Sequence, residues 1–330
     1  MEAILNNCCG LDIHKSTIVG CILKTKPILD RTKTVDNDYY QEIREFNAYP
    51  EGIEQLKQWI ISNNCHHVAM ESVGIYWIPV YEALETAFDG NIELIVTNAR
   101  HMKNVPGKKT DIKDAKWIAS LYRAGLLKAS FIPTHEFREL RQLTRYRKNI
   151  TRDIATQKNR IEKTLQQAGF KLSNILSDIF GTSGRNLINV LINKGRLTTK
   201  DIDVSVVRIA KEKISEIKIA ITGTLSKHQR DFLKIQMNLL DQLIAHLSIT
   251  EEKISCITEK FITQLTQLET IPGISTTSAI SILAEIGIDM SKFPTADHFC
   301  SWAGLSPGCN ESAGKKKVLA FNKVTPILKA

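Results

Sequence analysis

The sequence predicts an N-terminal α/β domain, long helices in the middle of the chain and a small helical domain at the C-terminus. Up to about residue 130, short apolar runs typical of strands alternate with helical patterns, which indicates a sheet with helices packed on it. From about residue 134 to 270, apolar residues recur at near-heptad spacing and strand signals are few. We therefore expect domains over residues 1–130, 131–267 and 268–330.

Composition limits the class of protein. The 330 residues are 43% hydrophobic and 24% charged, which excludes an intrinsically disordered chain. No run approaches the roughly 18 consecutive apolar residues of a membrane span, and the N-terminus lacks a basic region followed by an apolar one, so we expect a cytoplasmic protein. The seven cysteines are scattered and odd in number, which favours buried, reduced thiols. The net charge of +9 favours a polyanionic partner.

The first strand-forming stretch carries a carboxylate among apolar residues. Residues 8–23 form two apolar runs joined by a polar turn, and Asp12 lies in the first run. Burying a carboxylate is costly unless a metal ion, a cation or hydrogen-bond donors compensate it. Asp12 therefore needs a partner, unless it only caps the following turn. A third strand is predicted over residues 31–35.

The elements that follow continue the alternation of strands and helices. A helix is predicted to begin near residue 50, and a short strand over residues 67–71 ends in Glu71. A second helix and a further strand over residues 92–97 come next. Open α/β sheets place their sites at the carboxyl ends of strands, so Glu71 is a candidate site residue.

Two more carboxylates occur at the start of the next predicted helix, for which Thr110 is a suitable N-cap. Asp111 and Asp114 are three residues apart, so both project from one face of the first turn. Two acids on a helix turn and two on strands can form a site for a divalent cation such as Mg²⁺. Acids in a first turn also serve ordinary helix electrostatics, and that interpretation stays open.

The long helix predicted from about residue 134 is rich in basic residues. These are Arg138, Arg141, Arg145, Arg147, Lys148, Arg152, Lys158, Arg160 and Lys163. A charged helix face is usually solvated, but this density of one sign favours phosphate contacts, for which we single out Arg145, Lys148 and Arg152. A second long helix, with an apolar stripe over residues 239–265, is predicted to pack on the first or on another subunit.

The C-terminal segment contains two candidate phosphate-binding features. Residues 268–287 look like a helix-hairpin-helix, in which the turn at Gly273 and the next helix offer backbone N–H groups to a phosphate. Ser312 stands among small residues ahead of Lys315 and Lys316, so it is a candidate phosphate binder, or a nucleophile if a base removes its proton. A flexible basic turn is the alternative interpretation.

These motifs occur together and in order, and in combination they resemble the DEDD transposases of bacterial insertion sequences, described as bridge-RNA-guided recombinases. The resemblance extends to about residue 317. The residues that carry it are 10–15 (GLDIHK), 71–72 (ES), 110–115 (TDIKDA), 271–273 (IPG), 302–305 (WAGL) and 310–315 (NESAGK).

The resemblance implies a RuvC-like N-terminal domain of the RNase H fold, a helical coiled-coil middle and a C-terminal transposase domain with a catalytic serine. It implies that the four carboxylates hold Mg²⁺ and that Ser312 is the nucleophile. The implied partners are the DNA of transposon ends and targets, a structured non-coding guide RNA and further copies of the chain in a homo-oligomer. The implied place of action is the bacterial nucleoid in the cytoplasm.

Three alternatives remain at this point. A metal-dependent junction resolvase or nuclease shares the carboxylates but attacks with water and has no need of Ser312. An actin-like ATPase also begins with a Gly-x-Asp hairpin, although its later glycine-rich phosphate loops are not found. The third is an inactive DNA-binding remnant, because after Lys317 the chain departs from its relatives and Pro326 interrupts the expected helix. We expect a truncated C-terminal domain and weak recombination.

Overall fold

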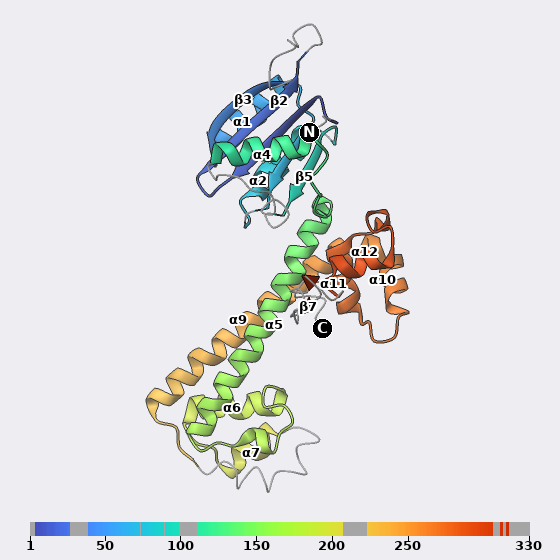
Figure 1. Ribbon diagram of the computed structural model, residues 1–330. Coiled ribbons are helices and arrows are strands. Elements are labelled where there is room, and N and C mark those ends of the chain that lie inside the picture. The colour runs from blue at the N-terminus through green and yellow to red at the C-terminus, as the bar shows by residue number, and fades with distance from the viewer. Residues whose placement is uncertain are drawn as a thin grey trace. The chain divides into compact units, whose positions relative to one another are not determined.

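The computed structural model describes residues 4–26, 39–72, 74–88, 90–98, 111–206, 223–305, 311–312 and 315–316. They belong to two compact units, Met1–Ile132 and Pro133–Ala330 (Figure 1). The strand predicted over residues 31–35 and the divergent tail after Lys317 fall outside the described residues. Separate domains over residues 131–267 and 268–330 stay a prediction.

Unit 1 is built on a five-stranded sheet of order β3-β2-β1-β4-β5. β1 pairs antiparallel with β2 and β2 antiparallel with β3, whereas β1–β4 and β4–β5 are parallel pairs. The α/β class predicted for this part of the chain is therefore confirmed. The strands are β1 (Asn7–Ile13), β2 (Thr17–Thr25), β3 (Tyr39–Asn47), β4 (His67–Glu71) and β5 (Glu93–Thr97).

Helices cover both faces of this sheet. Successive side chains of β1 point to opposite sides, so this strand contributes to two cores. Cys9 and Leu11 join a core with α1 (Pro50–Ser62) and α2 (Trp77–Ala87). Cys8 lies on the opposite face, in a core with α4 (Asp111–Arg123). Burial on both faces explains why β1 and β2 are continuous apolar runs in the sequence.

Strand β3 is the element of the sheet that the sequence analysis missed. Among the described strands it lies at the edge of the sheet and pairs with β2, and Phe46 is its one buried residue. An edge strand with this little burial has a weak apolar alternation, so its position could not be found from hydrophobic pattern.

Unit 2 begins with α5 (His135–Gln167), which packs along α9 (Lys227–Thr258). Toward the end of α5, Ile161 and Leu165 share a core with Leu233 of α9. The same core includes residues of the 3₁₀-helix η2 (Leu172–Asn174), α6 (Thr182–Lys194) and α7 (Thr199–Ser205). The elements η2, α6 and α7 thus form a small helical cap at the end of the α5–α9 pair, as Figure 1 shows.

Part of the chain that follows α9 packs near the start of α5. Phe137 and Leu140 share a core with Phe261, Leu283 and Ala284. The elements after α9 are η4 (Glu259–Phe261), α10 (Ile262–Glu269), α11 (Thr276–Ile286), η5 (Met290–Lys292), α12 (Ala296–Trp302), β6 (Glu311–Ser312) and β7 (Lys315–Lys316). The predicted pair of short helices joined by a turn therefore corresponds to α10 and α11. None of the described helices combines the length and hydropathy needed to cross a membrane.

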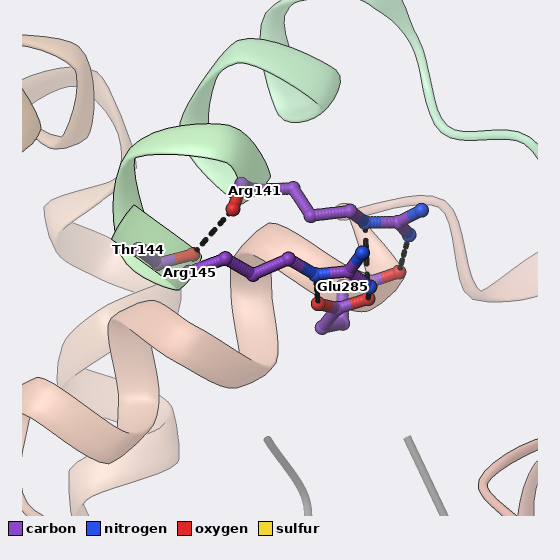
Figure 2. A network of polar contacts seen from close by, with 4 residues as sticks. All are labelled: Arg141, Thr144, Arg145 and Glu285. Atoms are coloured by element: carbon purple, nitrogen blue, oxygen red, sulfur yellow. Dashed lines mark hydrogen bonds and ion pairs between the residues drawn. The ribbon is translucent and has the colours of Figure 1, made fainter. Parts of the chain in front are cut away.

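A buried ionic network joins α11 to α5 (Figure 2). Glu285 is fully buried, with its Oε1 accepting from Arg145 Nε at 2.9 Å and its Oε2 accepting from Arg145 Nη2 at 3.0 Å. Arg141 Nε lies 3.0 Å from Oε2, and Arg141 Nη2 donates to the Glu285 backbone carbonyl at 2.6 Å. One carboxylate thus receives two guanidinium groups, which is the compensation that a buried charge requires.

This network predicts the effect of Glu285→Gln on stability. Removing the charge leaves two guanidinium groups without their carboxylate, so we expect the free energy of unfolding of unit 2 to fall by about 3 kcal/mol. This is the lower end of the range for a broken buried pair, because Arg145 is half-exposed. Urea unfolding followed by circular dichroism measures it. The control is Glu269→Gln on the exposed end of α10, which should change stability by less than about 0.5 kcal/mol. Equal midpoints for both variants would contradict the prediction.

Candidate active site

Two of the predicted carboxylates lie at the carboxyl ends of adjacent parallel strands. The pairing of β1 with β4 runs from Cys9 opposite Val68 to Leu11 opposite Met70. Asp12 and Glu71 are the next residues on their strands, so they follow side by side at the carboxyl ends. This is the edge at which open α/β sheets place their sites.

Both carboxylates belong to the face of the sheet that α4 covers. Cys8 on β1 and Ala69 on β4 lie in the core formed with α4. Because side chains alternate along a strand, Asp12 and Glu71 project to that same face. Asp12 is 3% exposed, and Glu71 is half-buried.

Helix α4 carries the other two predicted carboxylates and runs antiparallel to β1. Its late residues lie near the start of the strands, since Cys8 Sγ is 3.5 Å from the carbonyl of Ala119 and Tyr122 Oη donates to the carbonyl of Glu93 at 3.5 Å. The first turn, with Asp111 and Asp114, is therefore directed toward the carboxyl ends of β1 and β4. Asp114 is half-buried, and the side chain of Asp111 is outside the described atoms.

The close approach of α4 to β1 depends on Gly10. A β carbon at this position would overlap backbone atoms of Ala115 and Ala119. Gly10 thus lets the helix backbone lie directly on the strand, two residues before Asp12. The spacing between the strand carboxylates and the helix carboxylates follows from this contact.

His14 is a neighbour of the site that the sequence analysis did not single out. Its Nε2 lies 3.2 Å from Asp12 Oδ2, and its side chain is 42% exposed. With the proton on Nε2, the imidazole donates to the carboxylate and offsets part of the cost of burying it. The only sequence signal is that His14 follows Asp12 by two residues at the end of a strand.

The chemistry of the donor set fits a hard divalent cation, because the candidate ligands are carboxylates only. Among the side chains that the structure describes, no three His, Cys, Asp or Glu residues are grouped as a metal site. The side chains of Asp12, Glu71 and Asp114 are described and do not form such a group, whereas the side chain of Asp111 is outside the described atoms. The backbone arrangement brings the four carboxylate-bearing positions to one end of the sheet, while a four-ligand site stays a prediction.

The cysteines of unit 1 are not candidates for this chemistry. Cys8, Cys9, Cys21 and Cys65 are buried and free, which confirms the predicted reduced thiols there. Burial raises the pKa of Cys8 and of Cys21 to about 12 and that of Cys65 to about 11. At neutral pH these groups stay protonated, and a thiol is a poor nucleophile and metal ligand. Cys256, in contrast, is exposed.

Ser312 lies in unit 2, in a short antiparallel hairpin. Its backbone pairs with Lys315, and Glu311 pairs with Lys316. The side chains of these residues are outside the described atoms. The structure therefore places the predicted nucleophile opposite a predicted phosphate-binding lysine in the register of the hairpin.

The predicted phosphate contacts of α5 fall into two groups. Arg145 is bound to Glu285, and the neighbouring Arg147 donates to the carbonyl of Thr277 and to Ser281 Oγ, both at 3.2 Å. Lys148 and Arg152 are exposed, as the prediction requires. Gly273 lies in the exposed turn between α10 and α11 at a φ of +90°, a conformation that favours glycine.

Two family models match this chain in the parts that carry these residues. Residues 9–170 match the DEDD transposase model of the IS110 group, described as a transposase. Residues 265–325 match a model described as the transposase IS116/IS110/IS902 family. The two segments together cover about two thirds of the chain. The chain belongs to the IS110 family of DEDD transposases. The four carboxylates of this transposase lie in the first matched segment, and Ser312 lies in the second.

Three solved structures are similar to part of this transposase. Thermus thermophilus RuvC is 10% identical, with a TM-score of 0.27, over 38% of this chain and 99% of that chain. The same protein bound to a Holliday junction is 13% identical, with a TM-score of 0.27, over 38% and 100%. A Fowlpox virus resolvase bound to Holliday junction DNA is 14% identical, with a TM-score of 0.26, over 36% and 99%. The comparison with curated proteins found no match.

The packing at Gly10 yields a prediction for Gly10→Ala. The added methyl group forces α4 away from β1, which we expect to destabilise unit 1 by about 3 kcal/mol, at the upper end for overpacking. Thermal unfolding of the purified protein measures the change. The control is Gly181→Ala, where the new β carbon would have neighbours at an ordinary 3.5 Å. An unchanged unfolding temperature for Gly10→Ala would show that α4 does not rest on β1 in this way.

Proposed function

We propose that this transposase cuts DNA at the ends of an insertion sequence and joins it to a target, using the four carboxylates and Ser312. The observation that supports this most is the placement of Asp12 and Glu71 side by side at the carboxyl ends of adjacent parallel strands. They lie on the face where the first turn of α4 carries Asp111 and Asp114. The strand order of unit 1 supports a RuvC-like domain of the RNase H fold.

The proposal includes Mg²⁺ as the cofactor. Asp12, Glu71, Asp111 and Asp114 would hold it, because Mg²⁺ takes oxygen ligands and often binds through few carboxylates. When bound, a divalent cation polarises the scissile phosphate and stabilises the leaving oxygen. Asp12 is buried and contacts His14 at 3.2 Å, which supports a defined position for its carboxylate.

Ser312 is the proposed nucleophile. Its Oγ forms a bond to the scissile phosphorus while the bond from phosphorus to the leaving deoxyribose oxygen breaks. The proton of the serine hydroxyl passes to a base, and the leaving oxygen takes up a proton. The covalent phosphoserine link conserves the phosphodiester bond energy for rejoining. A positive charge at Lys315, opposite Ser312 in the hairpin, would stabilise the attacked phosphate.

The proposed partners follow from charge and family. The net charge of +9 and the exposed Lys148, Arg152 and Arg160 of α5 support binding of nucleic acid. The proposal includes a structured non-coding RNA that pairs with donor and target DNA, so that base pairing selects the sequence and the protein recognises backbone and shape. It also includes assembly of the chain into a homo-oligomer.

A junction resolvase that attacks with water is the second candidate, because unit 1 alone carries all four carboxylates. The two candidates differ in the product of a single turnover. A serine recombinase leaves a protein–DNA adduct, whereas a water-using nuclease leaves a free nick.

The experiment traps this product with Mg²⁺, cognate DNA ends and the RNA encoded beside the gene. We expect an adduct that maps to Ser312 in the unaltered chain and no adduct with Ser312→Ala. Asp12→Asn should lower cleavage by more than about 100-fold, since a proposed metal ligand is lost, with an unchanged circular dichroism spectrum. Asp153→Asn on the exposed side of α5 is the matched control and should retain cleavage. Nicking without an adduct in the unaltered protein would favour the resolvase.

The exposed basic residues of α5 yield a separate prediction. The double variant Lys148→Gln/Arg152→Gln should bind DNA less tightly. The negative slope of log affinity against log salt concentration should become shallower by about 2, since two phosphate contacts are lost. Fluorescence anisotropy at several salt concentrations measures it. Arg145 is left unchanged because its loss would disturb Glu285.

The control for this prediction is Lys227→Gln/Lys234→Gln, which removes two exposed lysines of α9 and should leave the slope as it is. If the α5 variant has the slope of the unaltered protein, Lys148 and Arg152 belong to a solvated face.

A further inference from the structure

A buried hydroxyl group lies at the carboxyl end of β5 without a hydrogen-bond partner. Thr97 is 0% exposed, and its Oγ1 has no partner in the part of the chain that the structure describes. Burying an unsatisfied hydroxyl costs free energy, and nearly all such groups in folded proteins are bonded to protein, water or an ion. Thr97 is therefore a candidate to bond a group that the described residues do not supply.

The register of the sheet places this hydroxyl beside the candidate active site. Thr97 pairs with Glu71 across the parallel strands β5 and β4. The preceding pair, Met70 and Val96, points into the core with α1 and α2. Side chains alternate, so Glu71 and Thr97 both project to the face that α4 covers. Adjacent strands are about 4.8 Å apart, which brings the hydroxyl within reach of ligands around Glu71.

We propose that Thr97 is a positioning residue of the cation site, with its Oγ1 hydrogen-bonded to a water molecule in the shell of the bound cation. This inference rests on the proposed function, because it requires a cation at Glu71 and Asp12. Mg²⁺ keeps several of its waters when it binds to protein, and those waters need acceptors. A hydroxyl oxygen is such an acceptor, and outer partners of this kind orient the ligands of a metal.

The alternative is that Thr97 only suits a strand. β-branched residues favour strands, and in that case valine serves as well as threonine, because the two side chains have nearly the same shape. The first explanation requires the hydroxyl group for cation binding, whereas the second requires only the shape of the side chain. Thr97→Val removes it and keeps the shape, whereas Thr97→Ser keeps it and removes the methyl group.

The test uses the full chain and two measurements that do not depend on catalysis. Calorimetric titration with Mn²⁺ gives the dissociation constant, and the rise in unfolding temperature with Mg²⁺ gives an independent readout. We expect Thr97→Val to raise the Mn²⁺ dissociation constant by about 10- to 100-fold and Thr97→Ser to stay within about 3-fold of the unaltered chain. Without metal, Thr97→Val should unfold at the same temperature or higher, since an unsatisfied hydroxyl is gone.

The control is Thr250→Val, a buried threonine of α9 whose Oγ1 donates to the carbonyl of His246 at 2.7 Å. It should leave Mn²⁺ binding unchanged. Mn²⁺ binding by the unaltered chain and its loss in Asp12→Asn would support the cation site. If Thr97→Val then binds Mn²⁺ as tightly as the unaltered chain, only the role of Thr97 is overturned. Equal losses in the valine and serine variants overturn it too. An unaltered chain that binds no Mn²⁺ overturns the proposed cation site together with this inference.

Discussion

The parallel pairing of β1 with β4 is the constraint on which the candidate site depends. Parallel strands bring their carboxyl ends to the same edge, and the register fixes which residues meet there. A shift of one residue in this pairing would turn Glu71 to the opposite face, away from Asp12. The packing on the two faces opposes that shift, because it would place Met70 where Ala69 packs in the core with α4 and would bury Glu71 in the core with α1 and α2. The same packing that folds unit 1 therefore orients its carboxylates.

Helix α4 adds a second constraint to the same edge. Its position is set by backbone contact at Gly10, where a side chain would not fit, and by apolar contacts of Ile118 and Tyr122. Backbone contact is less adjustable than contact between long side chains. The first turn of α4 is consequently held at a defined height above the sheet, which suits a site whose ligands come from a helix and from strands.

The sequence was sufficient for the central strands, because continuous apolar runs are local signals, and the predicted ligands Asp12 and Glu71 lie on two of these strands. It was not sufficient for β3, whose edge position leaves little pattern. Thr97 could not be selected either, since its meaning depends on its pairing with Glu71. Sequence also could not show that Arg145 faces Glu285, which is 140 residues away and lies on another helix.

That ion pair changes what the positive charge of the chain means. The density of arginine and lysine on α5 suggests one continuous surface for phosphates, yet three of the arginines bind α11 through Glu285, Thr277 and Ser281. A guanidinium that satisfies a buried carboxylate is not available to nucleic acid without leaving that carboxylate unpaired, which is costly. The basic face of α5 is therefore divided. Its first half holds α11 in place, and its second half carries the exposed residues Lys148, Arg152 and Arg160.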